Sequence, residues 1–173
     1  EGVSMYKSSW SSDLSNETET VVYNLSHGNG GGPGQDVNNY IVDDIFPTEL
    51  KLVEFNVGEF PGTTQTVNVY YQTTSQPWTL WPSGPWDTDN DDDWVPVSEL
   101  GLGADYVTGL RFDFGTLPGG GAFHPSAPGV EGINIRLEAI DYSTLVFGTT
   151  IENCATTSAA NAGNGTILYS QTH

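Results

Sequence analysis

Glycine and proline interrupt this chain so often that almost no window is left in which a helix could grow. The 173 residues include 21 glycines and 10 prolines, and either residue weakens or ends a helix. Between them lie short runs rich in valine, isoleucine, tyrosine, phenylalanine and threonine, which favour strands. Several runs alternate apolar and polar residues, as at 67–71 and 110–114, a pattern typical of a sheet with one solvated face. The sequence therefore predicts an all-β chain.

The runs predict about nine strands, which is enough for a two-sheet antiparallel β-sandwich of immunoglobulin-like or jelly-roll-like type. The glycine-rich segments 28–34 and 118–121 are expected to be flexible loops. We expect one domain over 1–173, with a Trp- and Asp-rich elaboration at about 76–102. The predicted strands are 4–8, 19–26, 40–46, 50–57, 65–73, 106–114, 132–141, 149–158 and 166–171.

The strongly negative net charge of the chain excludes some classes of binding partner. Four basic residues stand against 22 acidic ones, for a formal net charge of -18, so nucleic acid and anionic membranes would be repelled. No run of residues is apolar enough to span a membrane, and no signal segment opens the chain. We therefore expect a mature or excised piece of a larger extracellular protein.

Cysteine and histidine offer little chemistry in the linear sequence. Cys154 is the only cysteine, so no intrachain disulfide can form, and we expect it to be a small buried residue. His27, His124 and His173 are scattered, without the spacing of a zinc site. No cofactor is expected to be required.

Three polar residues stand inside strand-like stretches: Lys7, Asp44 and Asn153. Alternation places Lys7 on the face of Met5, Asp44 with the apolar residues of 40–46, and Asn153 with Ile151. Burial lowers the pKa of a lysine and raises that of an aspartic acid. A neutral amine would then lie beside a protonated carboxyl and a carboxamide.

These groups can join covalently. The neutral amine of Lys7 can attack the carboxamide of Asn153 and displace ammonia, while protonated Asp44 polarises the amide and carries the proton. The fold supplies the high effective molarity that such an exchange needs. The reaction turns over once, so the protein is its own substrate and not an enzyme in the usual sense.

Three stretches resemble the conserved-repeat and collagen-adhesin-like domains of Gram-positive bacterial surface proteins: Val-Val-Tyr-Asn-Leu at 21–25, Asp-Asp-Ile-Phe-Pro-Thr-Glu-Leu at 43–50 and Ile-Glu-Asn-Cys-Ala-Thr-Thr at 151–157. The resemblance implies a β-sandwich used in adhesins and stalks, often with an internal Lys–Asn isopeptide bond. By position, Lys7 matches the family's lysine, Asp44 its acid and Asn153 its asparagine. The likeness is loose over 76–102.

Two neighbours compete for these roles. Asp43 adjoins Asp44, and a shift of one residue in strand phase would exchange them. Lys51 also lies on an apolar face, with Val53 and Phe55, and is a rival nucleophile. The simpler alternative is that Lys7 is a surface lysine and that Asn153 is an ordinary turn or strand amide.

The segment 76–102 holds a second candidate site. Asp87, Asp89 and Asp91 have the spacing with which a calcium loop begins, but position six is Asp92 and position twelve is Ser98, so it is not an EF-hand. A calcium site and a solvated acidic loop both remain open. The surrounding indoles can stack on sugars or cover an edge of the sandwich. They belong to Trp78, Trp81, Trp86 and Trp94.

The sequence thus favours a non-catalytic adhesin or stalk module at the bacterial cell surface or wall, locked by a Lys7–Asn153 bond with Asp44 as acid. Its expected partners are neighbouring domains and an unidentified protein or glycan ligand. The alternative is a carbohydrate-binding module that uses the Trp-rich acidic loop, with or without Ca²⁺. An enzyme with an unrecognised carboxylate pair has the least support.

Overall fold

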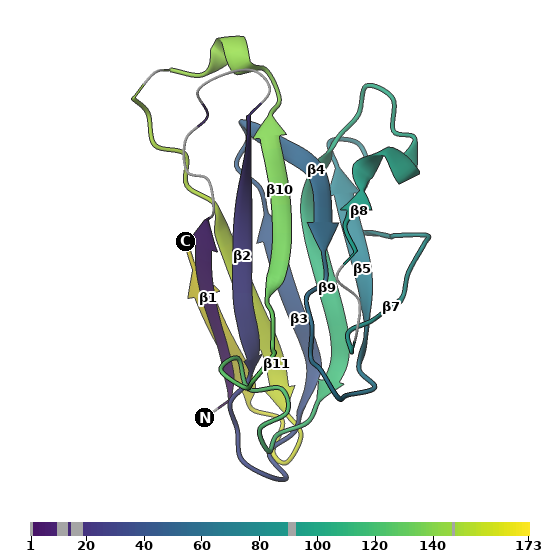
Figure 1. The fold of residues 1–173 in the computed structure, drawn as a ribbon, viewed down its shortest axis with the longest axis vertical. Coiled ribbons are helices and arrows are strands. Elements are labelled where there is room, and N and C mark those ends of the chain that lie inside the picture. The colour runs from purple at the N-terminus through teal and green to yellow at the C-terminus, as the bar shows by residue number, and fades with distance from the viewer. Residues whose placement is uncertain (1, 10–13, 15–18, 90–92, 147) are drawn as a thin grey trace.

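The computed structural model, described here for all residues except 1, 10–13, 15–18, 90–92 and 147, is built almost wholly from antiparallel strands in two facing sheets (Figure 1). One sheet has five strands in the order β1-β2-β10-β4-β8. The other has seven, in the order β12-β11-β3-β9-β5-β6, with β7 paired to β5. The predicted all-β sandwich is confirmed.

The element bounds are β1 (Val3–Ser9), β2 (Thr20–Asn29), β3 (Val37–Ile45), β4 (Leu50–Asn56), β5 (Thr66–Thr73), β6 (Thr79–Leu80), β7 (Trp86–Asp87), β8 (Val95–Pro96), β9 (Val107–Leu117), β10 (Ile133–Ala139), β11 (Cys154–Asn161) and β12 (Ile167–Thr172). Two 3-10 helices, η1 (Val97–Leu100) and η2 (Tyr142–Thr144), complete the described elements. In the described residues no helix has both the length and the apolar character of a membrane span.

The core lies between the two sheets and follows from alternation along the strands. On β5, for example, Val67, Val69 and Tyr71 are buried while the residues between them are exposed or half-buried. Phe55 of β4 meets Phe112 of β9 edge to face, with ring centroids 5.8 Å apart, and so joins the sheets. Such close packing makes any polar group in this layer costly unless it has a partner.

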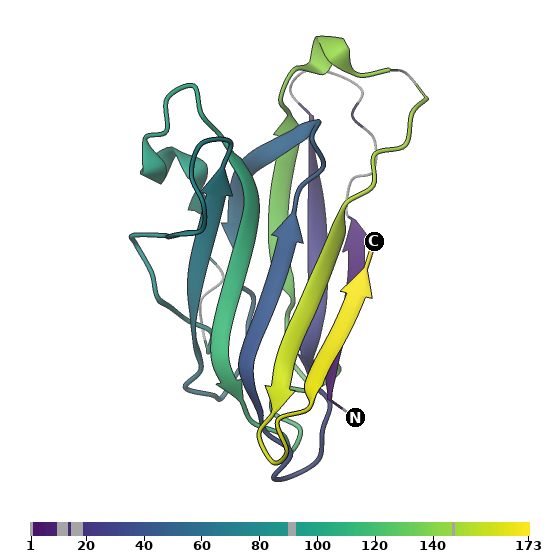
Figure 2. The same cartoon turned by 180° about the vertical axis from the view of Figure 1, so that it is seen from behind.

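Strands from the two ends of the chain meet along one side of the sandwich. β1 is the edge of the five-stranded sheet, β12 is the edge of the seven-stranded sheet, and β1 contacts both β12 and β11. Figure 2 shows the yellow β12 and the neighbouring β11 from behind, with the purple β1 close to them. Residues near both ends of the chain are therefore available to a single site.

The expectation of a flexible loop over 28–34 is wrong at its start. Gly28 lies within β2, and the backbone beside it donates from Asn29 N to the carbonyl of Phe123 at 3.0 Å. A Cβ atom at Gly28 would come within 2.0 Å of that carbonyl oxygen. Glycine is needed here because two backbones approach closely, and not because the segment must bend.

We predict that Gly28→Ala lowers the free energy of unfolding by about 1–3 kcal/mol, because the Phe123 backbone must shift to admit the methyl group. Gly32→Ala is the matched control, since the atom nearest to a Cβ there is a side-chain oxygen 4.0 Å away. Thermal melts of both variants test this. Equal melting temperatures for the two would contradict the close approach.

Candidate functional site

Lys7 lies on the inner face of β1. Tyr6, before it, is 70% exposed, whereas Lys7 is 9% exposed. Its Cα partner across the β1–β2 ladder is Leu25, which is fully buried. Lys7 is therefore held among apolar groups by strand alternation, as the sequence predicts, and is not a surface lysine.

Asp44 supplies the carboxyl group from β3. Tyr40, Val42 and Asp44 all point into the core and are each 0% exposed. Asp43 faces the other way, and both of its carboxylate oxygens accept hydrogen bonds from Arg111 at 2.8 Å. The structure therefore places Asp44, and not Asp43, beside Lys7.

Asn153 comes from the other end of the chain, immediately before β11. It is 3% exposed and continues the inward face of Ala155 and Thr157, which are both fully buried. Because β11 pairs with β3, with Ala155 opposite Asp44, the inward residue two positions earlier lies close to the Asp44 carboxyl. Sheet pairing alone thus brings the carboxamide to the acid.

The three polar groups meet at one oxygen atom. Lys7 Nζ lies 3.5 Å from Asp44 Oδ2, and Asn153 Nδ2 donates a hydrogen bond to the same oxygen at 3.1 Å. Lys7 Nζ also donates to the backbone carbonyl of Asn153 at 3.0 Å. The structure therefore gathers all three predicted residues, which lie up to 146 positions apart in sequence.

Burial shifts the pKa values of both charged groups toward their neutral forms. Desolvation lowers the pKa of Lys7 below its usual value, although the neighbouring Asp44 carboxylate opposes the shift. Desolvation also raises the pKa of Asp44 to about 6, against the opposing effects of Lys7 and Asn153. Both shifts favour an uncharged amine beside a protonated acid.

Two polar atoms in this site have no hydrogen-bond partner. Among the described residues, Asp44 Oδ1 and Asn153 Oδ1 are the buried side-chain atoms without one. A half-turn of the Asn153 carboxamide exchanges Oδ1 and Nδ2, so that a protonated Asp44 can donate to the amide oxygen. Such unsatisfied buried atoms are uncommon in folded proteins, and here they coincide with the candidate reacting groups.

A cavity of about 210 Å³ adjoins the site and is lined by Lys7, Tyr23, Asn153 and neighbouring residues of 150–152, together with His173. The ring of Tyr23 also packs on the amine, with Lys7 Nζ 4.9 Å from the ring centroid. Tyr23 is not among the site residues that the sequence predicts. The signal was present, since Tyr23 alternates with Leu25 on the strand that pairs with β1.

Lys51 does not join the site. The sequence places it on one face with Val53 and Phe55, but a bulge in the β4–β10 ladder leaves Val53 without a Cα partner and reverses the phase. Leu50, Leu52, Phe55 and Asn56 are the buried residues of β4, and Lys51 is half-buried opposite Glu138. The expected apolar face for Lys51 is therefore wrong.

The four tryptophans of 76–102 cover the sandwich in different ways. Trp81 is 0% exposed, and its indole nitrogen donates to Glu99 at 2.9 Å. Trp86 is half-buried and packs edge to face on Phe55, with centroids 5.5 Å apart. Trp81 therefore has no open face for a sugar, and Trp86 takes part in the aromatic packing of the core.

Trp78 and Trp94 are half-buried, and an arginine guanidinium lies over the indole ring of each. The guanidinium of Arg111 lies 4.6 Å from the Trp78 ring centroid, and that of Arg136 lies 5.2 Å from the Trp94 ring centroid. A guanidinium over an indole is a favourable cation–π contact. These faces are already occupied, which supports the covering interpretation.

The described part of the acidic loop is tied to backbone amides. Asp87 Oδ1 accepts from the amide of Asp89 at 2.9 Å, and Asp89 Oδ1 accepts from that of Gly62 at 2.5 Å. Both aspartates are exposed. Asp91 lies outside the described residues, so the calcium hypothesis stays a prediction.

Comparisons with known proteins give no assignment. No family model and no curated protein matched the chain. A solved structure described as "AvmM Catalyzes Macrocyclization in Alchivemycin A Biosynthesis" aligns over 97% of this chain and 86% of that chain, at 11% sequence identity and a TM-score of 0.31. A likeness this weak carries no argument about function.

We predict that Asn153→Ala, which keeps Lys7 and Asp44, loses stability as the pH rises from about 4 to about 6. With Asn153 present the folded state keeps the Asp44 proton up to a pKa of about 6, whereas the unfolded chain releases it near 3.8, and the loss of the Asn153 hydrogen bond, which lowers this pKa, leaves the direction of the shift unchanged. Folding thus binds a proton in this window, and stability falls by up to about 3 kcal/mol. Urea unfolding at stepped pH measures it.

The matched control is the double variant Asp44→Asn with Asn153→Ala, which has no carboxyl to titrate at this position. Its free energy of unfolding should lack this fall. The same pH dependence in both variants would show that Asp44 titrates as an ordinary carboxyl.

Proposed function

We propose that the chain is a structural β-sandwich module of a bacterial surface protein, stiffened by an internal amide bond between Lys7 and Asn153 that forms with Asp44 as acid. The observation that carries this proposal is the meeting of Lys7 Nζ and Asn153 Nδ2 at one buried oxygen of Asp44, at 3.5 and 3.1 Å. Such a site has no evident use for a diffusing substrate, because its reacting groups belong to the chain itself.

The chemistry balances within the three residues. The unprotonated Nζ of Lys7 attacks Cγ of Asn153, and protonated Asp44 donates to the carboxamide oxygen and stabilises the tetrahedral intermediate. The proton lost from Nζ passes through Asp44 to Nδ2, and the Cγ–Nδ2 bond breaks. One ammonia leaves and one secondary amide remains, so no oxidant, metal or cofactor is consumed.

The cavity beside the site is large enough to accept the ammonia that leaves. The cavity beside Lys7 and Asn153 measures about 210 Å³, while a water molecule, which is similar in size to ammonia, occupies about 30 Å³. Departure of ammonia into this space and then into solvent would make the exchange irreversible in practice. The otherwise dry surroundings protect the new amide from hydrolysis.

The position of the proposed bond would suit a mechanical role. Lys7 belongs to the five-stranded sheet, and Asn153 precedes β11 in the seven-stranded sheet. A bond between them spans the two sheets, and most of the fold lies within the loop that it closes. Tension applied outside residues 7 and 153 would pass through the bond and leave the intervening strands unloaded.

A surface location is part of the same proposal. The net charge of -18 and the resemblance to Gram-positive adhesin domains suit a wall-anchored stalk or adhesin with neighbouring domains. The alternative of a carbohydrate-binding module has less support, because Trp81 is in the core and arginines cover Trp78 and Trp94.

We predict that the purified chain weighs one ammonia less than its sequence. Lys7→Ala, Asp44→Ala and Asn153→Ala should each restore the full mass, since each removes a reacting group. Lys51→Ala is the matched control and should keep the deficit. High-accuracy intact mass spectrometry measures all five proteins.

Succinimide formation also loses ammonia, and Asn29-Gly30 and Asn164-Gly165 are candidate positions for it. Peptide mapping separates the two causes, because only the proposed bond yields a branched peptide containing both residue 7 and residue 153. A full-mass wild-type chain, or a deficit that survives Lys7→Ala, would refute the assignment.

The proposed bond should also raise thermal stability. Closing a loop between residues 146 positions apart should stabilise the fold by about 5 kcal/mol in the chain-entropy account. For a chain of this size that corresponds to about 10–20 °C in melting temperature. Calorimetry of wild type and Lys7→Met measures it, with Lys51→Met as the control.

The melts are best recorded near pH 5, where Asp44, with a pKa of about 6, keeps its proton and the variant does not bury a lone charge. We expect Lys51→Met to melt close to the wild type. A Lys7→Met variant that melts within about 3 °C of the wild type would contradict a covalent link.

A further inference from the structure

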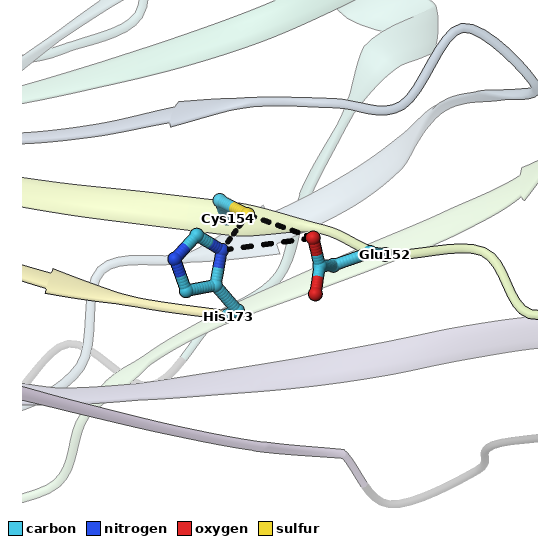
Figure 3. A group of neighbouring side chains, drawn as sticks. All are labelled: Glu152, Cys154 and His173. Carbon is cyan, nitrogen blue, oxygen red and sulfur yellow. Dashed lines mark hydrogen bonds and ion pairs between the residues drawn. The ribbon is translucent and has the colours of Figure 1, made fainter.

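The side chains of Glu152, Cys154 and His173 lie close together (Figure 3). They are not part of the Lys7, Asp44 and Asn153 cluster. Cys154 Sγ lies 3.8 Å from Glu152 Oε1 and in contact with His173 Nδ1. His173 Nδ1 lies 3.9 Å from the same Glu152 oxygen. One sulfur, one imidazole nitrogen and one carboxylate oxygen therefore surround a common point.

Strand geometry explains the convergence. Ala155 pairs with Thr172 across the β11–β12 ladder, so the next positions outward bring Cys154 opposite His173. Glu152 lies two residues before Cys154 and shares its side of the chain, because Asn153 between them points inward. The side chains are therefore cross-strand and next-but-one neighbours, and this relation is invisible in the linear sequence.

The expectations for these residues need two corrections. Cys154 is half-exposed and not a buried core residue, because the inward position belongs to Asn153. His173 is not isolated from other potential ligands, because it adjoins the only cysteine of the chain.

A catalytic triad does not fit this arrangement. In a triad the histidine uses one ring nitrogen for the nucleophile and the other for the acid, whereas here the thiol and the carboxylate both approach Nδ1. Burial, followed by the charge of Glu152, also raises the pKa of the Cys154 thiol, the reverse of what an activated nucleophile needs. A bound cation would instead make use of all three atoms.

We propose that Glu152, Cys154 and His173 bind one Zn²⁺ ion, with water in the fourth position. Zinc takes cysteine sulfur, histidine nitrogen and carboxylate oxygen in tetrahedral sites with bond lengths of about 2.0–2.3 Å. Ligand atoms in such a site are about 3.4–3.6 Å apart, close to the observed 3.8 and 3.9 Å.

One adjustment remains. The thiol and the imidazole, now in contact, must separate to admit the ion. The side chains of His173 and Glu152 are 48% and 70% exposed, so they can rotate without disturbing the core. The thiol binds as a thiolate and releases its proton to solvent.

The site would join the exposed edge strand to the rest of its sheet. His173 follows β12, whereas Glu152 and Cys154 lie on either side of Asn153 at the start of β11. A metal bridge here would hold the end of β12 against β11. This inference does not depend on the Lys7–Asn153 bond, since it uses different side chains.

Cobalt provides the test, because a cysteine-bound Co²⁺ gives a sulfur-to-metal charge-transfer band in the near ultraviolet. The chain, reduced with a non-chelating phosphine and free of any added histidine tag, is titrated with Co²⁺ and then with Zn²⁺. We expect one Co²⁺ per chain with this band, and its loss when Zn²⁺ displaces the cobalt.

Variants locate the ligands. Cys154→Ser should abolish the band, and His173→Gln and Glu152→Gln should each raise the Kd for Co²⁺ about tenfold or more. His124→Gln is the matched control and should bind like the wild type. Absence of the band in the wild type, or an unchanged Kd in His173→Gln, would overturn the proposal.

Discussion

The central constraint on this structure is the desolvation cost of burying the amine of Lys7 and the carboxyl group of Asp44 between the two sheets. Lys7 and Asp44 are 9% and 0% exposed, and a pair of charges so placed costs several kcal/mol unless its partners are well arranged. Here the arrangement is incomplete, since one oxygen of Asp44 and one of Asn153 lack hydrogen-bond partners. The proposed bond between Lys7 and Asn153 would remove the titratable amine from this layer.

The sandwich supplies the geometry that this chemistry requires. Lys7 enters from one sheet, while Asp44 and Asn153 come from adjacent strands of the other. The packed core holds them near each other, so the proposed reaction would gain effective molarity without a substrate-binding site. The cluster of Glu152, Cys154 and His173 lies beside it, and the proposed zinc site there would have separate chemistry. The proposed amide bond and the proposed zinc site would then both stabilise the packing of β11 and β12.

Much of this could be predicted from residue patterns, and the failures have local causes. Alternation places Lys7, Asp44 and Asn153 inward without knowledge of the fold, because each stands in a regular strand or its direct extension. For Lys51 the same alternation gives the wrong face, because a bulge at Val53 changes the phase of inward and outward residues along β4. The neighbours Cys154 and His173 depend on the β11–β12 register, which composition and spacing do not encode.

A crystal structure of the purified chain tests the central claim most directly. The account predicts continuous density from Lys7 Nζ to Asn153 Cγ, with a bond of about 1.33 Å and a planar amide, and with Asp44 hydrogen-bonded to the new group. Density for a free carboxamide at Asn153, separated from the amine by a non-bonded contact of about 3 Å or more, would contradict it.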